Sequence, residues 1–234
     1  MAGFMDKLKT SLNVVGEKFK LTNAALAGVI KENTEMLAAN EKLSKESKES
    51  IASLKNYANT ETPAIKEAFN NISQALEQIE ASREKMVAQL RKDYLAPLNK
   101  LIEGWKTLQT EIKEADDAAK KLEGAKKDLE KVKAKPAEKK KPNEEEQANA
   151  KLTAAQEKAS KEAEDVAKAT AKFNEEKVKT LKDALNMLAD TEKDFYSKAA
   201  QLLEASKTKI AAIDVQKEAA AVVEAAAPAA DAPK

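Results

Sequence analysis

A seven-residue repeat of apolar side chains runs through the middle of this chain, and it limits the fold more than any other feature. Apolar or small residues recur in steps of three and four over residues 65–90 and again over 98–122. Steps of this size line up on one side of an α-helix, and a stripe this long is buried when helices pack along a shared seam. The repeat positions are Ile65, Phe69, Ile72, Leu76, Ile79, Met86, Leu90, Leu98, Leu101, Trp105, Leu108, Ile112, Ala115, Ala119 and Leu122, with Arg83 in the one gap. The sequence therefore predicts an all-α protein whose long helices pack as a coiled coil.

The repeat is disturbed at one place, beside Pro97. There the spacing becomes four and four, through Leu90, Tyr94 and Leu98. An inserted step of four rotates the apolar stripe and locally unwinds a supercoil. Proline removes a backbone donor and bends a helix that continues through it. We therefore expect this long helix to be kinked at Pro97.

Two segments rich in turn residues divide the chain into three helices. Residues 56–63 (NYANTETP) place Thr62 to cap a helix and Pro63 at its first position, and residues 133–146 (KAKPAEKKKPNEEE) combine two prolines with dense charge. The predicted helices cover about 21–56, 63–134 and 144–213, with a loop at 135–143 and a disordered, alanine-rich tail over 214–234. Short turns make consecutive helices antiparallel, and such thin helices favour a homodimer that buries more apolar surface.

The composition argues against an enzyme. The 234 residues include no histidine and no cysteine, which excludes zinc sites of the usual kind, thiol nucleophiles and histidine general bases. Neither a glycine-rich phosphate loop nor a G-x-S-x-G motif is present, so no catalytic residue, metal site or cofactor is predicted. The sequence has no apolar run of about 18 residues and no signal-peptide core, and we expect a cytoplasmic protein.

A resemblance to a known family rests on residues 63–213. The segment from Thr62 to Lys133 resembles the second helix of BAR domains of the endophilin and amphiphysin type. The likeness is carried by the aromatic-x-x-Pro-Leu stretch at Tyr94–Leu98, followed by Leu122, Glu123 and Gly124 and then a basic run towards the tip. The helix from Asn143 onwards is similar to the third, so that the likeness covers about residues 20–213. The resemblance implies a crescent-shaped homodimer with a central six-helix bundle. It also implies a basic concave face and basic tips that bind anionic membranes.

The candidate membrane-binding residues are lysines around the predicted loop. Ten lysines and four acidic residues lie between positions 120 and 141, which gives a local excess of +6 in a chain whose net charge is +1. The lysines are Lys120, Lys121, Lys126, Lys127, Lys131, Lys133, Lys135, Lys139, Lys140 and Lys141, and Lys120, Lys127 and Lys131 share one stripe. Each basic residue near an anionic leaflet contributes about 1 kcal/mol. The alternative is a solvated helix end, which charged coiled coils commonly have. Lys161, Lys168, Lys172 and Lys179 also align, but Asp165 and Glu175 among them favour ordinary pairing within the helix.

The N-terminus contains a second candidate, a predicted amphipathic helix over residues 1–20. Its apolar sector holds Met1 and the proposed insertion residues Phe4, Leu8, Leu12, Val15 and Phe19, with lysines at both borders. Such a helix suits shallow insertion at a bilayer surface. Packing of the same helix against the bundle is the alternative, since Val14 and Leu21 lie off the apolar sector.

Three hypotheses follow. The first is a peripheral membrane protein in trafficking, endocytosis or membrane remodelling, a homodimer that senses or generates curvature on anionic lipids such as phosphatidylserine and phosphoinositides. The second is a scaffolding or cytoskeletal coiled coil that binds proteins through its charged faces. The third is a lipid-binding bundle that opens on lipid droplets. Nucleic acid is not expected as a partner, because few aromatic residues lie among the lysines.

Overall fold

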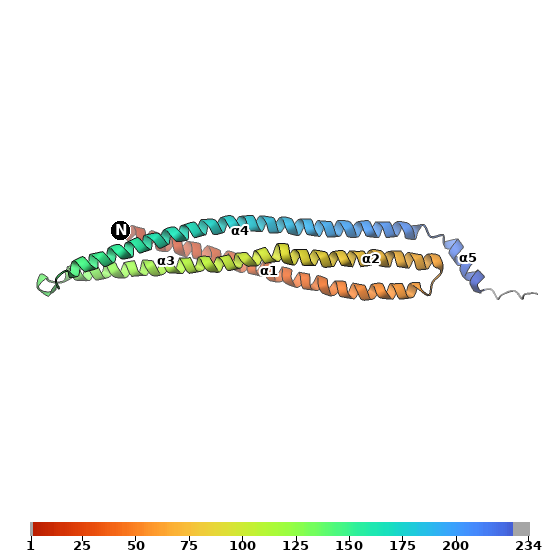
Figure 1. The fold of residues 1–234 in the computed structure, drawn as a ribbon, viewed down its shortest axis with the longest axis horizontal. Helices are drawn as coiled ribbons and strands as arrows, with labels where there is room; N and C mark the ends of the chain where they lie inside the picture. The colour runs from red at the N-terminus through yellow and green to blue at the C-terminus, as the bar shows by residue number, and fades with distance from the viewer. Residues whose placement is uncertain (1, 227–234) are drawn as a thin grey trace, which may run out of the picture. The chain divides into compact units, whose positions relative to one another are not determined.

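A computed structural model describes the backbone of residues 2–226 and, within that range, all side chains except those of 2–9, 11, 13, 18, 137 and 221–226 (Figure 1). Its elements are α1 (Ala2–Ala58), α2 (Pro63–Gln89), a π-helical turn η1 (Leu90–Leu95), α3 (Ala96–Ala134), a 3-10 turn η2 (Ala137–Lys139), α4 (Glu144–Ala211) and α5 (Val215–Ala226). No strand occurs over residues 2–226. The predicted all-α fold is confirmed.

The helices divide into two compact units. Within the described residues, 2–31 and 96–183 form unit 1, and 32–95 and 184–226 form unit 2. The long helices α1 and α4 each contribute one part to each unit, so each unit is built from two separate stretches of the chain.

Unit 1 contains a hairpin of α3 and α4 joined by residues 135–143, and the two helices run antiparallel away from that connection (Figure 1). Its core near the connection is made of small residues, with Ala118, Ala119 and Ala159 packed around Leu122. Alanines let helices approach closely, because they hold no side chain beyond Cβ between the backbones. The predicted repeat positions of α3 from Leu98 to Leu122 are buried, except for the half-buried Ile112.

Unit 2 packs the rest of α1 against α2 and the last part of α4. Its buried side chains include Leu37 and Ile51 from α1, Ile79 and Met86 from α2, and Phe195 from α4. The gap in the repeat holds a polar layer. The Arg83 Nε lies 3.0 Å from Glu80 Oε2, its Nη1 donates to Asn40 Oδ1 at 3.1 Å, and its guanidinium lies 5.0 Å from the centre of the Phe195 ring.

The disturbed spacing beside Pro97 takes the form of a π turn. The α-helical hydrogen bonding of α2 ends at Gln89, and α3 begins at Ala96 directly after the π turn, so that Pro97 lies inside one continuous helix. The missing donor is tolerated beside the π turn, because the wider turn interrupts the regular α-helical hydrogen-bond pattern that a proline would otherwise break. Leu90, Tyr94 and Leu98 are all buried, because the wider turn keeps all three side chains on the core side. The sequence predicts an irregularity at this place but not its form, and a bend at Pro97 stays a prediction.

Two expected boundaries differ from the structure. The segment 1–20 is not separate, because α1 runs unbroken from Ala2 to Ala58, with Gly16 tolerated inside it. Residues 215–226 form α5 where a disordered tail was expected. Alanine is the best helix former, and Asp214 caps the helix: its Oδ1 accepts hydrogen bonds from the N–H groups of Gln216 and Lys217 at 3.0 and 3.1 Å. The rest of the predicted tail, residues 227–234, lies outside the described residues.

The cap expected from Thr62 also differs. Thr62 occupies the N-cap position of α2 with Pro63 after it, as predicted, but its side chain makes no capping hydrogen bond. The Thr62 hydroxyl donates instead to Glu218 Oε2 of α5, at 2.6 Å. This contact fixes the start of α5 beside the start of α2.

Candidate functional site

The predicted lysine cluster lies at the connection between α3 and α4 in unit 1. The connection is a compact series of turns, in which the Lys139 N–H donates to Pro136 O at 2.9 Å and the Glu144 N–H to Lys141 O at 3.2 Å. Asn143 adopts φ 60°, a left-handed conformation that asparagine tolerates better than most residues. These turns place lysines of α3 and of the loop at one end of the hairpin.

The lysine stripe singled out on α3 is a series of intrahelical ion pairs. Lys120 Nζ lies 2.6 Å from Asp116 Oδ2, Lys127 Nζ lies 3.0 Å from Glu123 Oε1, and Lys131 Nζ lies 3.5 Å from Asp128 Oδ1. The Asp116 carboxylate raises the pKa of Lys120, first by its hydrogen bond and then by its charge. These three ammonium groups therefore already have carboxylate partners.

Two loop lysines pair with the glutamates that begin α4. Lys135 Nζ contacts Glu144 Oε1 at 2.5 Å, and Lys140 Nζ contacts Glu145 Oε2 at 3.2 Å. The hydrogen bond from Lys135 lowers the pKa of Glu144, and the backbone N–H of Lys141 lowers it further. Glutamates at the start of α4 thus close the loop rather than only facing the helix dipole.

The other five candidate lysines make no ion pair with any residue that the structure describes. They are Lys121, Lys126, Lys133, Lys139 and Lys141, of which only Lys126 is half-buried and the rest are exposed. The structure thus divides the ten candidates into five paired and five unpaired ammonium groups. This division was hidden in the sequence, where Lys133 and Lys135 look alike.

The surrounding carboxylates also change the charge balance. Counted from Asp116 to Glu146, so that every carboxylate paired with the cluster is included, ten lysines face nine acidic residues. The local excess therefore falls from +6 to +1. The total charge of this region is therefore nearly balanced.

A second lysine stripe, on α4, was expected to pair within its helix. Only Lys168 does so among the four, with Glu164 Oε1 at 2.6 Å rather than with the Asp165 or Glu175 side chain that the sequence suggested. Lys161, Lys172 and Lys179 are exposed and make no ion pair in the described part of the chain, so that expectation is wrong for them. The spacing of 7, 4 and 7 residues keeps all four on one face of α4, away from buried Val166.

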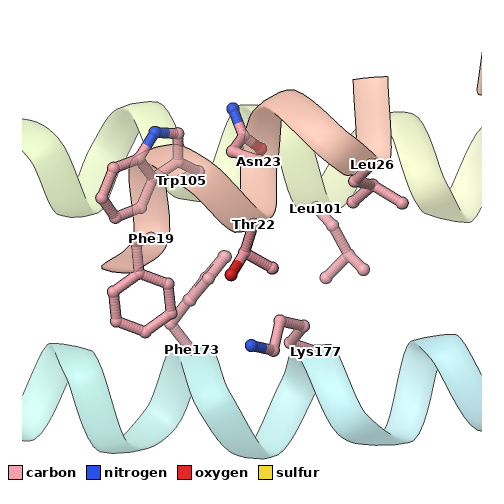
Figure 2. Close-up of a pocket in the computed structure, with 8 residues that line it drawn as sticks. All are labelled: Phe19, Thr22, Asn23, Leu26, Leu101, Trp105, Phe173 and Lys177. Atoms are coloured by element: carbon pink, nitrogen blue, oxygen red, sulfur yellow. The ribbon is translucent and has the colours of Figure 1, made fainter. Parts of the chain in front are cut away.

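The N-terminal apolar sector packs against α3 and α4 in unit 1. Leu12 and Phe19 are each only 6% exposed, and Val15 is half-buried. Phe19 stacks on Trp105 with ring centres 5.2 Å apart and meets Phe173 edge-on at 5.4 Å (Figure 2). The side chains of Phe4 and Leu8 lie outside the described residues. This arrangement corresponds to the packing alternative for residues 10–20.

Exposed apolar side chains in unit 2 follow heptad spacing. On α1 they are Met36, Leu43 and Tyr57, and on α4 they are Leu185, Tyr196, Leu203 and Ile210. Steps of 7 and 14 residues on α1, and of 11, 7 and 7 on α4, place each set on one face of its helix. Large apolar side chains aligned on two helices are typical of an association surface.

Other site types find no support in the described residues. No group of three or more acidic, histidine or cysteine residues there is placed to hold a metal ion. Within the same part of the chain, no helix has the length and apolar character needed to cross a bilayer.

Comparison with known families decides between the remaining fold types. The family model described as "BAR domain of APPL family" matches residues 7–227, nearly the whole sequence. The chain belongs to the BAR domain family. The expected resemblance is thereby confirmed at the family level, although the matching model is the APPL type rather than the endophilin and amphiphysin type.

Solved BAR domains have the same fold at low sequence identity. The amphiphysin BAR domain from Drosophila has a TM-score of 0.71 at 14% identity, over 88% of this chain and 94% of that one. The N-terminal I-BAR domain of IBARa from D. discoideum has a TM-score of 0.57 at 12% identity, over 95% of this chain and 98% of that one. No curated protein matches the sequence. BAR domains are structural modules, not enzymes, that bind membranes, dimerise, and sense or generate curvature.

Proposed function

We propose that this BAR domain binds anionic membranes peripherally, as a homodimer that senses or generates curvature in membrane trafficking or remodelling. The chain belongs to a membrane-binding family. The observation that carries the proposal is the set of lysines at the end of the α3–α4 hairpin that have no carboxylate partner among the described residues. An ammonium group without an intramolecular partner can meet a lipid phosphate or carboxylate without first breaking an ion pair.

The lipid contact is assigned to two groups of unpaired lysines. Lys133, Lys139 and Lys141 belong to the hairpin end, and Lys161, Lys172 and Lys179 belong to the exposed face of α4. At about 1 kcal/mol for each lysine near an anionic leaflet, three of them contribute about 3 kcal/mol per protomer. Phosphatidylserine and phosphoinositides supply the negative charge that this mechanism needs.

Dimerisation is assigned to the two exposed apolar stripes of unit 2. A second copy of the chain is the proposed occupant, because a stripe such as Leu185, Tyr196 and Leu203 continues the heptad pattern that already packs the helices within one protomer. Two protomers double the number of lysines that reach one membrane, which strengthens binding without any new contact.

The test compares two triple variants with the same change of charge. Lys133→Gln, Lys139→Gln and Lys141→Gln together remove unpaired lysines, whereas Lys120→Gln, Lys127→Gln and Lys131→Gln remove paired ones. Co-sedimentation with phosphatidylserine vesicles at two salt concentrations measures both. We expect a loss of affinity on the order of 100-fold per protomer for the first triple, larger where both protomers of a dimer reach the membrane, and a smaller loss for the second triple. Equal losses would show that only net charge matters, and no loss in either would refute the electrostatic mechanism at the hairpin end.

A scaffolding role is the second candidate, and the balanced charge of residues 116–146 favours it. Ten lysines among nine acidic residues present both signs to a protein partner. This role predicts a stable homodimer in solution that leaves phosphatidylserine vesicles unbound and unchanged in shape at low salt. Electron microscopy of vesicles mixed with the protein separates the two, since tubules or coats are expected only from a curvature-generating module.

A further inference from the structure

The apolar face at the start of α1 is suited to two different surroundings, the protein core and a lipid surface. The sequence pattern places Leu12, Val15 and Phe19 on the sector suited to a bilayer surface, with lysines along its borders. In unit 1 the same sector is covered by α3 and α4, which leaves Leu12 and Phe19 buried. One face cannot be covered by protein and by lipid at the same time.

The covering residues come from both helices of the hairpin. Leu12 packs with Ala115 of α3 and Val166 of α4. Phe19 lies between Trp105 of α3 and Phe173 of α4, and Figure 2 shows the two phenylalanine rings turned towards each other beside the indole. The Lys177 ammonium lies 5.3 Å from the centre of the Phe19 ring, and the cavity that these side chains line has a volume of only about 10 Å³. Phe19 is therefore closely packed against both helices.

The segment is otherwise held loosely. The described side chains between residues 10 and 21 make no hydrogen bond or ion pair to α3 or α4, apart from the contact of Lys177 with the Phe19 ring. A groove of about 340 Å³ runs beside the segment, between α1 and α3, and Gly16 and Gln109 border it. Apolar contacts of this kind are exchanged for lipid at little cost, since no buried polar group loses a partner.

We infer that the start of α1 is a releasable strap, which docks on unit 1 through Leu12 and Phe19 and leaves it when the same face enters a lipid surface. The inference rests on the proposed membrane binding and adds a competition to it. The docked strap keeps the insertion face covered in solution. An anionic bilayer binds that face and shifts the equilibrium towards the released strap. Every contact that stabilises the docked strap therefore weakens membrane binding.

Trp105 provides an internal reporter, because it is the chain's single tryptophan and it is buried against Phe19. When the strap leaves, water reaches the indole and its fluorescence moves to longer wavelength. We expect this shift when vesicles of phosphatidylserine and phosphatidylcholine are added to the full chain. The Phe19→Ala variant should show the shifted emission without vesicles, since loss of a buried phenylalanine lowers the docking equilibrium on the order of 100-fold or more.

Two variants separate docking from insertion. Phe173→Ala removes a docking partner and leaves the strap unchanged, so it should bind vesicles more tightly than the native chain. Phe19→Ala loosens docking but also removes an insertion residue, so it should bind less tightly than Phe173→Ala. Leu129→Ala is the matched control, because it cuts a buried side chain of α3 further along the same hairpin, where none of the described strap side chains packs. An increase for Leu129→Ala as large as for Phe173→Ala would overturn the strap, since general loosening would then explain it.

A covalent lock completes the test. The chain has no cysteine of its own, so Gly16→Cys and Gln109→Cys can be joined by a bismaleimide across the groove that both residues border. We expect the locked protein to lose the Trp105 shift and to bind vesicles more weakly than the same variant left uncoupled. Full binding by the locked protein, or binding by the native chain without a Trp105 shift, overturns the strap and leaves the proposed function intact. No vesicle binding by any variant overturns the proposed function, and the strap with it.

Discussion

The polar layer around Arg83 in unit 2 gives the sharpest prediction about stability. The Arg83 and Glu80 side chains are only 17% and 6% exposed, and the guanidinium also contacts Asn40 and the Phe195 ring. Arg83→Ala leaves the Glu80 carboxylate buried without its counter-charge and leaves the Asn40 amide oxygen without its donor. We expect this substitution to be among the most destabilising single changes in the protein.

The magnitude follows from the burial of the pair. Removing one partner of a buried ion pair costs about 3–5 kcal/mol, whereas replacing both partners by apolar residues of similar size is often neutral or stabilising by about 1–4 kcal/mol. The double variant Glu80→Leu with Arg83→Met should therefore recover most or all of the stability that Arg83→Ala loses. The layer would then contribute to the register of the helices more than to their stability.

Urea unfolding followed by circular dichroism measures both variants, at one protein concentration because dimerisation adds to apparent stability. Lys48→Ala is the matched control. Lys48 also joins α1 to α2, through Glu84 at 2.5 Å, but both side chains are about half exposed, and its loss should cost less than about 1 kcal/mol. A cost below about 1 kcal/mol for Arg83→Ala, or a double variant as unstable as the single one, would refute the reasoning.

Three further predictions concern other parts of the chain. Gly124→Ala should raise the melting temperature by about 2–4 °C, because a Cβ at this exposed helical position meets no atom within 4 Å and alanine favours the helix by about 1 kcal/mol; an unchanged melting temperature would contradict it. Tyr196→Asp should yield a monomer in sedimentation velocity, whereas Ser197→Asp, on a different face of α4, should remain dimeric. A dimeric Tyr196→Asp variant would exclude the exposed apolar stripe of α4 as the interface. Because Lys135 lowers the pKa of Glu144, their ion pair is present above the ordinary glutamate pKa and is lost as the pH falls through the lowered value. Glu144→Gln should imitate that loss at neutral pH, because it frees the Lys135 ammonium for anionic lipid. Co-sedimentation should then show stronger binding to phosphatidylglycerol vesicles, and weaker binding would contradict this role of Lys135.

Much of the fold follows from the sequence, because helix period and turn residues act locally. The step pattern places buried Leu98, Leu101 and Trp105 correctly, and the clustered turn residues before Pro63 locate the start of α2. The form of the turn at Leu90–Leu95 does not follow, since a four-residue step is compatible with a bend, an unwound supercoil or a π turn. The family resemblance rests on the same pattern and is correct at the family level.

The candidate site is less accessible to sequence reasoning, because ion pairing depends on which acidic residues neighbour each lysine in space. The stripe of Lys120, Lys127 and Lys131 looked the most available and is the most fully paired. A search for acidic residues three and four positions before each lysine would have found these partners. No such rule finds the pairs that close the loop, such as Lys135 with Glu144, because they depend on the turn between them.

The π turn has a consequence for how this protein tolerates changes in length. A π turn holds one residue more than an α turn, so it absorbs the extra residue of the four-and-four spacing and later positions of α3 keep their direction. One deletion within Leu90–Leu95 would restore regular α-helix and leave Leu98, Leu101 and Trp105 in the apolar sector, whereas one deletion in the regular part of α3 would rotate every later position by about 100°. A single lost codon should therefore be far less harmful in this turn than elsewhere in the same helix.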